Sequence, residues 1–542
     1  MSSTGTTESS TSVQPSILLA MIPVVALIGL LAVNVLTYGD SATSGPNQIA
    51  LIFAAAIAAM VGWSLSVPFK SMLDGIVDSL GSALGAILIL LMIGALSGTW
   101  MLSGVVPAMV YYGLAILEPS YFLVAATIIC AVVSVATGSS WSTVATVGVA
   151  LIGIGTALGA SPPMTAGAII SGAYFGDKLS PLSDTTNLAS AMAGTDLIVH
   201  IRYMLWTTVP SLLIALGVFY YLGTSLDASA ANSEDVAALS ELIASRFVIS
   251  PWLFLVPATV VGLVLFKVDA LVALFVGTML GGVVAIYVQP DIVREISSFD
   301  FGERLEGWPI WLANTVEYAA DAYIALINSM SGINDGIDLS QSLTEVEQVA
   351  KGEGREAIME LTAKQRANVY ASDLLGSKGM AGMLNTIWLI VCAMCFGGVM
   401  EACGLLKRIT DVLVSFAKST GSLIATTAGS CLFLNFTASD QYLAIVVPGR
   451  MFRETYRERG LAPENLSRTL EDSGTVTSPL IPWNTCGAVQ AGVLGVGTLQ
   501  YLQYCVFNYV SPFMTILVGF AGLGIVMLAT GTSSSQEEKE TD

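Results

Sequence analysis

The chain has 542 residues, of which 54% are hydrophobic and only 11% are charged, and its mean hydropathy is +0.74. Soluble domains carry roughly 25% charged residues, so this composition excludes an ordinary soluble globular protein. The formal net charge is −19, from 40 acidic against 21 basic residues. Such an acidic surface repels phosphates and excludes a nucleic-acid partner. The acidic excess recurs in nearly every loop, which is typical of proteins from salt-loving organisms.

Apolar segments long enough to cross a bilayer follow one another along the chain. About 20 apolar residues cross the hydrocarbon core as a helix. The predicted spans are 17–38, 48–65, 83–101, 121–137, 144–158, 205–222, 252–266 and 270–288, followed by 383–403, 423–436, 442–449, a broken stretch at 469–497, and 501–528. This pattern predicts an all-α, multi-pass protein of the cell membrane, with the lipid bilayer as its main partner.

Polar segments divide the chain into regions. The Ser/Thr-rich stretch 1–16 has no basic residue before the first apolar run, so we expect a disordered leader and not a cleaved signal peptide. The predicted regions are then a first transmembrane region 17–223, an acidic loop 224–250, a transmembrane hairpin 251–289, an acidic segment 290–382, a second transmembrane region 383–530 and an acidic tail 531–542.

The charges of the loops predict an orientation. Between residues 291 and 378, fifteen acidic residues stand against seven basic ones. Basic residues gather instead at 200–202, 407–408 and 450–468. Cytoplasmic loops carry an excess of Lys and Arg, so these three segments are expected inside and the acidic segments outside.

The cysteine and histidine content argues against a cofactor or a catalytic triad. The seven cysteines all fall in or beside apolar runs, where they act as small hydrophobes. His200 is the only histidine, which excludes a His-rich metal site and a Ser-His-Asp arrangement. An intramembrane aspartyl protease would need a G-x-G-D signature, and residues 174–177 read Tyr-Phe-Gly-Asp. We therefore expect no enzyme and no cofactor.

Two motifs recur about 300 residues apart. Ser-Pro-Leu at 180–182 returns at 478–480, each followed by an asparagine beside a threonine, and polar clusters lie upstream at 139–143 and 437–441. The basic segment follows the first motif but precedes the second, so the two copies have opposite orientations. The pattern predicts inverted-topology repeats with broken or re-entrant helices, an architecture of secondary transporters that favours alternating access over a passive channel.

The stretch 172–187 is the densest polar run in an apolar setting. A charged side chain at the bilayer centre costs roughly 2.5–3.5 kcal/mol on insertion scales, so its aspartates are a sign of function. Pro181 must break the helix near Ser180, which frees backbone carbonyls. Carbonyls, hydroxyls, an amide and a carboxylate form the oxygen-only set that a hard cation such as sodium prefers. We expect Lys178 to pair with Asp177, leaving Asp184 as the favoured exchange carboxylate.

The predicted ion-binding and transport residues come from both copies: Asp177, Ser180, Asp184, Thr185, Thr186, Asn187, Asp440, Asn484 and Thr485. Four of them are expected to hold Na⁺: Asp184, Thr185, Asn187 and Asn484. Secondary candidates are Lys178, Ser183, Glu401, Glu471, Asp472 and Ser478, and for the three Glu and Asp residues a structural role at a helix end is an equal alternative. A carboxylate that binds either the cation or protons, and faces the two sides in turn, is sufficient for exchange.

The run 172–187 resembles, almost letter for letter, the pattern of NhaC-type Na⁺/H⁺ antiporters, and the stretches 396–401 and 478–485 resemble the same family. The resemblance implies an antiporter of the ion transporter superfamily that exchanges Na⁺, or Li⁺, for H⁺. Similar sequences look like sodium-coupled exchangers of malate and lactate or of amino acids. That alternative would use Lys178 as a fixed positive group. The resemblance leaves a homodimer open and does not explain the acidic insertion around 335–371.

Overall fold

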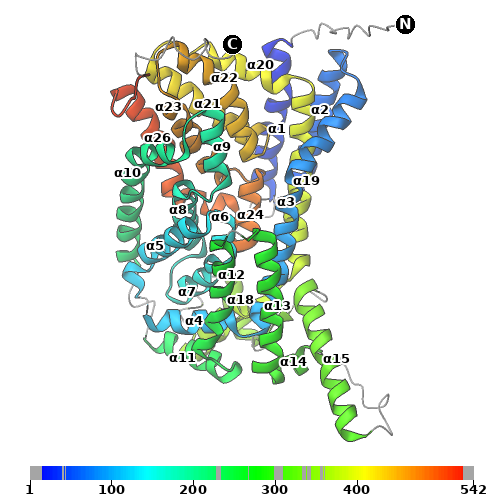
Figure 1. Ribbon diagram of the computed structural model, residues 1–542. Helices are drawn as coiled ribbons and strands as arrows, with labels where there is room; N and C mark the ends of the chain where they lie inside the picture. Colours follow the sequence, from blue (N-terminus) through cyan, green and yellow to red (C-terminus); the bar gives the residue numbers. More distant parts are fainter. Residues whose placement is uncertain are drawn as a thin grey trace, which may run out of the picture.

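The computed structural model describes residues 15–38, 42, 44–116, 118–226, 233–266, 268–297, 309–332, 337–338, 343–353, 358 and 361–528. Most of the predicted leader, the predicted acidic tail and parts of both acidic segments lie outside the described residues. Figure 1 shows a long helical bundle that extends from α20 and α22 at one end to α11, α14 and α15 at the other.

The bundle is built almost entirely of helices. Within the described ranges, the named strands are a single antiparallel pair of two residues each, β1 (Ile337–Asp338) and β2 (Gly376–Ser377). Eight described helices are long and apolar enough to cross a membrane, and two bent helix pairs raise the number to ten. The prediction of an all-α, polytopic membrane protein is confirmed.

The first half of the chain contains α1 (Ile17–Tyr38), α2 (Pro46–Ser64), α3 (Phe69–Leu102), α4 (Val105–Ile116), α5 (Pro119–Thr137), α6 (Ser140–Thr143), a π-helical turn (Val144–Gly148), α7 (Val149–Ala157), α8 (Pro162–Leu179), α9 (Asp184–Ala193) and α10 (Leu197–Thr224). It is followed by α11 (Ser233–Arg246), α12 (Leu255–Leu265) and α13 (Ala270–Val288).

The acidic segment then forms α14 (Pro290–Ser297), α15 (Ile310–Ser331), α16 (Glu345–Glu353) and α18 (Ala363–Leu374). The second half continues with α19 (Leu384–Ala402), α20 (Leu405–Val414), α21 (Thr420–Thr437), α22 (Gln441–Glu458), α23 (Pro463–Leu470), a π-helical turn (Glu471–Thr475), a 3₁₀ turn (Ser478–Leu480), α24 (Thr485–Leu494), α25 (Thr498–Tyr501) and α26 (Val506–Ala521). The spans predicted at 17–38 and 270–288 coincide with α1 and α13. Helix α4 was missed because its 12 residues are too short for a span.

The two halves repeat the same succession of helices and breaks. Helices α23, α24 and α25 begin 301 residues after α8, α9 and α10, at 463 and 162, 485 and 184, and 498 and 197. The backbone repeats too, because Gly138 (φ 70) and Ser439 (φ 61) are both left-handed, as are Gly194 (φ 81) and Gly495 (φ 66). The predicted duplication is confirmed at the level of the backbone.

The register of the duplication differs from the sequence-based one by three residues. The sequence paired the tripeptide at 180–182 with that at 478–480, but the helix boundaries pair Pro181 with Pro482. The second tripeptide lies in a 3₁₀ turn before the break, and the extended residue there is Ile481 (φ −109, ψ 117), the counterpart of Ser180 (φ −83, ψ 129). The tripeptide match was wrong because backbone conformation, and not side-chain identity, marks the break.

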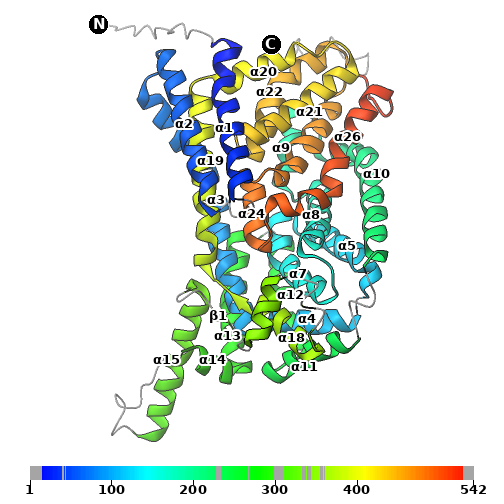
Figure 2. The same cartoon turned by 180° about the vertical axis from the view of Figure 1, so that it is seen from behind.

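The two copies have opposite orientations along the bundle. In Figure 1, α4 lies at the end formed by α11, α14 and α15, whereas its counterpart α20 lies at the opposite end with α22. The long helices α3 and α19 pack against each other and join the two halves in both views (Figure 1 and Figure 2). The predicted inverted topology is confirmed.

The basic and acidic segments separate to the two ends. We call the end with α20 and the α22–α23 turn the basic end, and the end with α11 and α14 the acidic end (Figure 2). Tyr203 near the start of α10 donates a hydrogen bond to Asn465 of α23 (2.5 Å). The basic segment 200–202 therefore lies at the basic end, together with the basic segments 407–408 and 450–468. The positive-inside rule predicts that this end faces the cytoplasm.

The α7–α8 turn and the α22–α23 turn are counterparts and are expected on opposite sides of the membrane. In a cysteine-free variant, single cysteines at Ser161 and at Glu458 should react with a membrane-impermeant maleimide from opposite sides, Ser161→Cys from outside and Glu458→Cys only after permeabilisation. Labelling of both positions from the same side would refute the inverted arrangement.

Candidate ion-binding site

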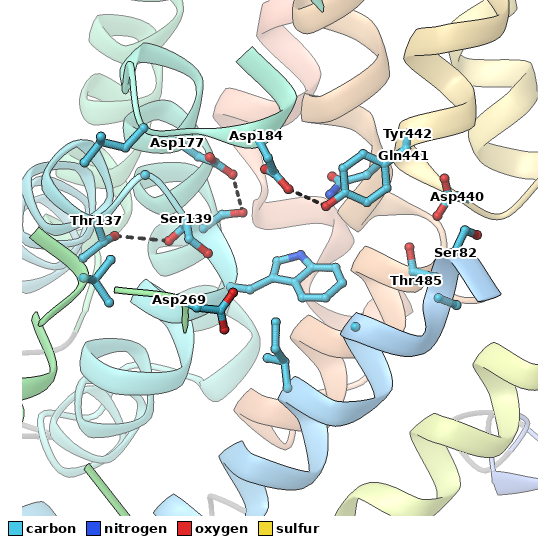
Figure 3. Close-up of a pocket in the computed structure, with 18 of the residues that line it drawn as sticks. Ser82, Thr137, Ser139, Asp177, Asp184, Asp269, Asp440, Gln441, Tyr442 and Thr485 are labelled. Atoms are coloured by element: carbon cyan, nitrogen blue, oxygen red, sulfur yellow. Dashed lines mark hydrogen bonds between the residues drawn. The ribbon is translucent and has the colours of Figure 1, made fainter. Parts of the chain in front are cut away.

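We call the interruptions between α5 and α6, between α8 and α9, between α21 and α22, and before α24 the breaks. The breaks of both repeats meet at one cavity of about 570 Å³ (Figure 3). Its wall is formed by 137–141 between α5 and α6, by residues around the α8–α9 break, by 440–442 at the start of α22, and by Thr485 at the start of α24. Helix α3 and the turn between α12 and α13 complete the wall. The chain therefore brings irregular backbone from four places to one cavity, where such backbone is tolerated at membrane depth.

Each break is closed by a capping side chain that accepts a hydrogen bond from the following helix: Ser139, Ser183, Asp440 and Asn484. The carboxylate of Asp440 accepts from the N–H of Leu443 at 2.9 Å. Helix N-termini carry partial positive charge. Because the helices that follow these caps begin at or beside the cavity, they favour negative side chains there.

Three carboxylates of the predicted set line this cavity. Asp177 is 5% exposed and accepts a hydrogen bond from the Ser140 hydroxyl at 2.7 Å, while its second oxygen has no hydrogen-bond partner among the described residues. Asp184, the favoured exchange carboxylate, was expected to be buried, but it is exposed, and it accepts a hydrogen bond from the Tyr442 hydroxyl, as the dashed line in Figure 3 shows. Asp440 is 2% exposed. Two of these carboxylates come from the first repeat and one from the second.

The expected pairing of Lys178 with Asp177 is wrong. The Lys178 ammonium group pairs with Asp472 on the π-helical turn, both side chains are fully buried, and Lys178 also donates to the Ser511 hydroxyl at 3.1 Å. Consecutive helical residues point about 100° apart, as the period of 3.6 residues requires. Asp177 therefore faces the cavity, while Lys178 faces α26 and the second repeat.

Neighbouring side chains on the first turn of α9 also point in different directions. Asp184 lines the cavity, whereas the hydroxyl of the next residue, Thr185, donates to Glu471 at 3.1 Å. Glu471 and Asp472 are fully buried, and each keeps one carboxylate oxygen without a hydrogen-bond partner in the part of the chain described. A second polar cluster, Lys178, Thr185, Glu471, Asp472 and Ser511, thus joins the two repeats behind the cavity.

The remaining predicted residues of the first copy hold the α8–α9 break together. Thr186 donates to the carbonyl of Lys178 at 3.1 Å, and the Asn187 amide donates to the carbonyl of Ser183 at 2.6 Å. Ser180 accepts from the N–H of Leu182 at 3.2 Å. The carbonyl of Lys178 that the break leaves free is thus already bonded to Thr186.

In the second copy, the Asn484 amide donates to the carbonyl of Asn435 at 3.0 Å, and the Ser478 hydroxyl donates to the carbonyl of Thr475 at 2.6 Å. Glu401 is exposed near the end of α19. Of the predicted set, Asp177, Asp184, Asp440 and Thr485 line the cavity, and the other residues lie around the breaks, behind them or away from them.

The comparisons with known proteins agree with this architecture. Residues 172–299 and 356–523 match the model of the Na⁺/H⁺ antiporter family. The chain is 36% identical to the Na⁺/H⁺ antiporter NhaC of Alkalihalophilus pseudofirmus, over 88% of this chain and 91% of that protein. The chain belongs to the Na⁺/H⁺ antiporter family. The predicted multi-pass antiporter of sodium ions and protons in the cell membrane is confirmed.

Two further relatives of this antiporter come from Bacillus subtilis. One is another Na⁺/H⁺ antiporter NhaC, 33% identical over 88% of this chain and 91% of the relative. The other is named a malate-2H⁺/Na⁺-lactate antiporter and is 32% identical over 88% of this chain and 90% of the relative. All three relatives are transporters by name.

Several cavity residues of the antiporter were not assigned a role from the sequence. Ser140 and Gln441 lie in the polar clusters that marked the duplication, and each follows a capping residue directly. Tyr442 had the same signal, because it lies on the first turn after Asp440. Asp269, which lines the cavity from the turn before α13, had none, because nothing local connects that hairpin to the breaks.

The buried Lys178–Asp472 pair gives a stability prediction. Lys178→Met leaves Asp472 charged and unpaired, so the antiporter should lose about 3–5 kcal/mol of stability, seen as a lower thermal transition in detergent. The double variant Lys178→Met/Asp472→Leu should recover most of the loss. The exposed pair of Arg294 and Asp291 (4.0 Å) supplies the control, because Arg294→Gln should cost under about 1 kcal/mol. A single variant as stable as the native chain would contradict the pairing.

Proposed function

We propose that Na⁺ and H⁺ compete for the carboxylates of Asp177, Asp184 and Asp440 in the central cavity, and that this competition couples the two ions. The observation that carries the proposal is the meeting of these three side chains, contributed by both repeats, in one cavity. The Ser140 and Tyr442 hydroxyls and Thr485 complete an oxygen-rich wall of the kind that a hard cation prefers.

Charge compensation prevents Na⁺ and H⁺ from binding to the same carboxylate at the same time. Asp177 and Asp440 are buried, and a buried carboxylate is costly if it is charged and unpaired, so each of these two binds either a proton or a cation. Asp184 is exposed, and it contributes a carboxylate to the wall of the same cavity. Asp177 has one oxygen bonded to Ser140 and one oxygen without a partner among the described residues, which leaves that oxygen free for either ion. Entry of Na⁺ releases the proton, and return of the proton releases Na⁺.

The inverted repeats allow the cavity to open to the two sides of the membrane in turn. Two copies of one structure in opposite orientations can exchange conformations, so that the cavity between them faces each side in turn. The cluster of Lys178, Thr185, Glu471, Asp472 and Ser511 contacts both copies and lies where their relative position would change. We assign the remaining predicted residues, Ser180, Thr186, Asn187 and Asn484, to holding the breaks in shape.

An organic anion is the less favoured cargo. Lys178, the positive group that such a substrate would require, is paired with Asp472 outside the cavity. The cavity lining in the described part of the chain contains four aspartates, Asp177, Asp184, Asp269 and Asp440, and neither Lys nor Arg. This charge distribution attracts cations. The malate and lactate in the name of one relative make those anions the alternative to test.

Asp177→Asn and Asp184→Asn should each reduce sodium-dependent proton movement to the level of empty vesicles, because asparagine keeps the shape but cannot exchange a proton for a cation. The measurement is the recovery of a pH-sensitive dye in proteoliposomes after addition of Na⁺. Asp291→Asn, with a 98% exposed side chain at the acidic end, should keep full activity. Full exchange by the Asp177→Asn protein would remove that carboxylate from the site.

The same assay with different substrates identifies the transported ion. Na⁺ and Li⁺ should each collapse an imposed proton gradient, whereas K⁺, malate and lactate should not, because a cavity lined by aspartates disfavours anions and a small ion fits it best. Collapse by malate or lactate without any response to Na⁺ alone would favour the organic-anion reading.

A further inference from the structure

The central cavity of the antiporter is larger than a single Na⁺ requires. Its volume of about 570 Å³ lies within the range of roughly 300–1,000 Å³ that is typical of sites for small molecules. One molecule of liquid water takes up about 30 Å³, so one bare metal ion fills only a small part of this space. The cavity therefore has room for a ligand much bigger than a metal ion.

The carboxylates of the cavity are spread around its wall. Figure 3 shows Asp177 and Asp269 at the left of the view, Asp440 at the right, and Asp184 between them. Among the residues that the structure describes, no three His, Cys, Asp or Glu side chains are grouped so as to hold one metal ion. Negative charge is thus distributed over several faces of the cavity, which suits a cation whose own charge is spread over a large surface.

Aromatic and aliphatic side chains lie between these carboxylates. Trp141 on α6 and Tyr442 on α22 line the cavity, and so do Leu182, Val264 and Val268. A hydrated Na⁺ gains little from contact with such groups. The face of an aromatic ring, by contrast, attracts an organic cation within about 6 Å of the ring centroid. The wall therefore offers contacts that a small inorganic ion does not use.

One buried acceptor in the wall lacks a positive partner. Asp177 is 5% exposed, and its second carboxylate oxygen has no hydrogen-bond partner within the described part of the chain. A buried carboxylate needs a compensating charge nearby. Since the cavity lining among the described residues contains neither Lys nor Arg, a bound ligand has to supply that charge.

We propose that the central cavity also binds a small quaternary ammonium ion in competition with Na⁺. The methyl groups of the ion contact Trp141 and Tyr442, and its charge faces Asp177 and Asp440. Such an ion carries its charge on a methyl-covered surface, so aromatic rings and several surrounding carboxylates stabilise it together. The inference rests on the competition proposed above for these carboxylates, because the organic ion takes the place of Na⁺.

Binding is tested on the purified full-length antiporter in Na⁺-free detergent solution, with tetramethylammonium chloride as the probe. A ligand that binds the folded protein raises its thermal transition, so the transition should rise with the concentration of the probe and then saturate. KCl at the same concentrations controls for ionic strength, because K⁺ has no methyl surface to contact the rings. Equal responses to the two salts would overturn the proposal.

The position of the ion is tested in proteoliposomes. At the tetramethylammonium concentration that half-saturates the thermal shift, the Na⁺ concentration for half-maximal exchange should rise about twofold at an unchanged maximal rate, as competition for one site requires. A lower maximal rate with the same half-maximal Na⁺ concentration would place the ion elsewhere and contradict the inference. Failure of the cavity carboxylates themselves is a different result, since the Asp177→Asn protein would then still exchange Na⁺ for protons.

The aromatic contact is tested by substitution. Trp141→Leu should weaken tetramethylammonium binding about tenfold in the thermal measurement, and Trp141→Phe, which keeps a ring face, should weaken it less than about threefold. Trp311→Leu is the matched control, because Trp311 is 71% exposed on α15 and does not line the cavity, and it should bind as the native chain does.

A second variant keeps the test decisive if the Trp141→Leu protein does not fold. Tyr442→Leu removes the other ring of the wall and should also weaken tetramethylammonium binding severalfold. Native affinity in either folded leucine variant would show that its ring does not contact the ion, and the proposed site would be wrong.

Discussion

The structure depends on how it satisfies the backbone groups at four interrupted helices. In an apolar surrounding, each N–H and C=O group that leaves a helix must find another partner. The chain meets this need by placing the two breaks of each repeat against each other. In the second repeat, the N–H of Thr485 at one break donates to the carbonyl of Ser439 at the other, at 3.0 Å. In the first, Gly138 is the counterpart of Ser439, and a Cβ atom on it would lie 2.6 Å from the Leu182 side chain, so this particular contact favours glycine.

The same arrangement explains why acidic side chains can lie inside the bundle. The half-helices that start after each break begin at or beside the central cavity, and their N-termini compensate negative charge. Asp440 serves as a helix cap and as a cavity carboxylate at once. The capping requirement and the proposed ion site therefore share one structural feature.

The α8–α9 segment has two faces with different roles. Asp177 and Asp184 face the cavity, and their neighbours Lys178 and Thr185 face the second repeat. Each of these two cavity carboxylates is thus the immediate chain neighbour of a residue that contacts the second repeat. In the proposed mechanism, this proximity gives a short physical connection between ion binding in the cavity and the relative position of the two repeats.

The sequence alone determined that the chain is a multi-pass helical membrane protein, the separation of basic and acidic segments, the duplication and the neighbourhood of the candidate site. These properties are local: hydropathy needs about 20 consecutive residues, and a proline removes the backbone donor of its own residue. Only the tertiary structure decided the partners. Lys178 binds Asp472, which is 294 residues away, and Tyr442 binds Asp184 across 258 residues. Such contacts depend on how each helix is rotated and packed against its neighbours. A sequence pattern places a residue on a helix, but it does not say which distant helix that residue will face.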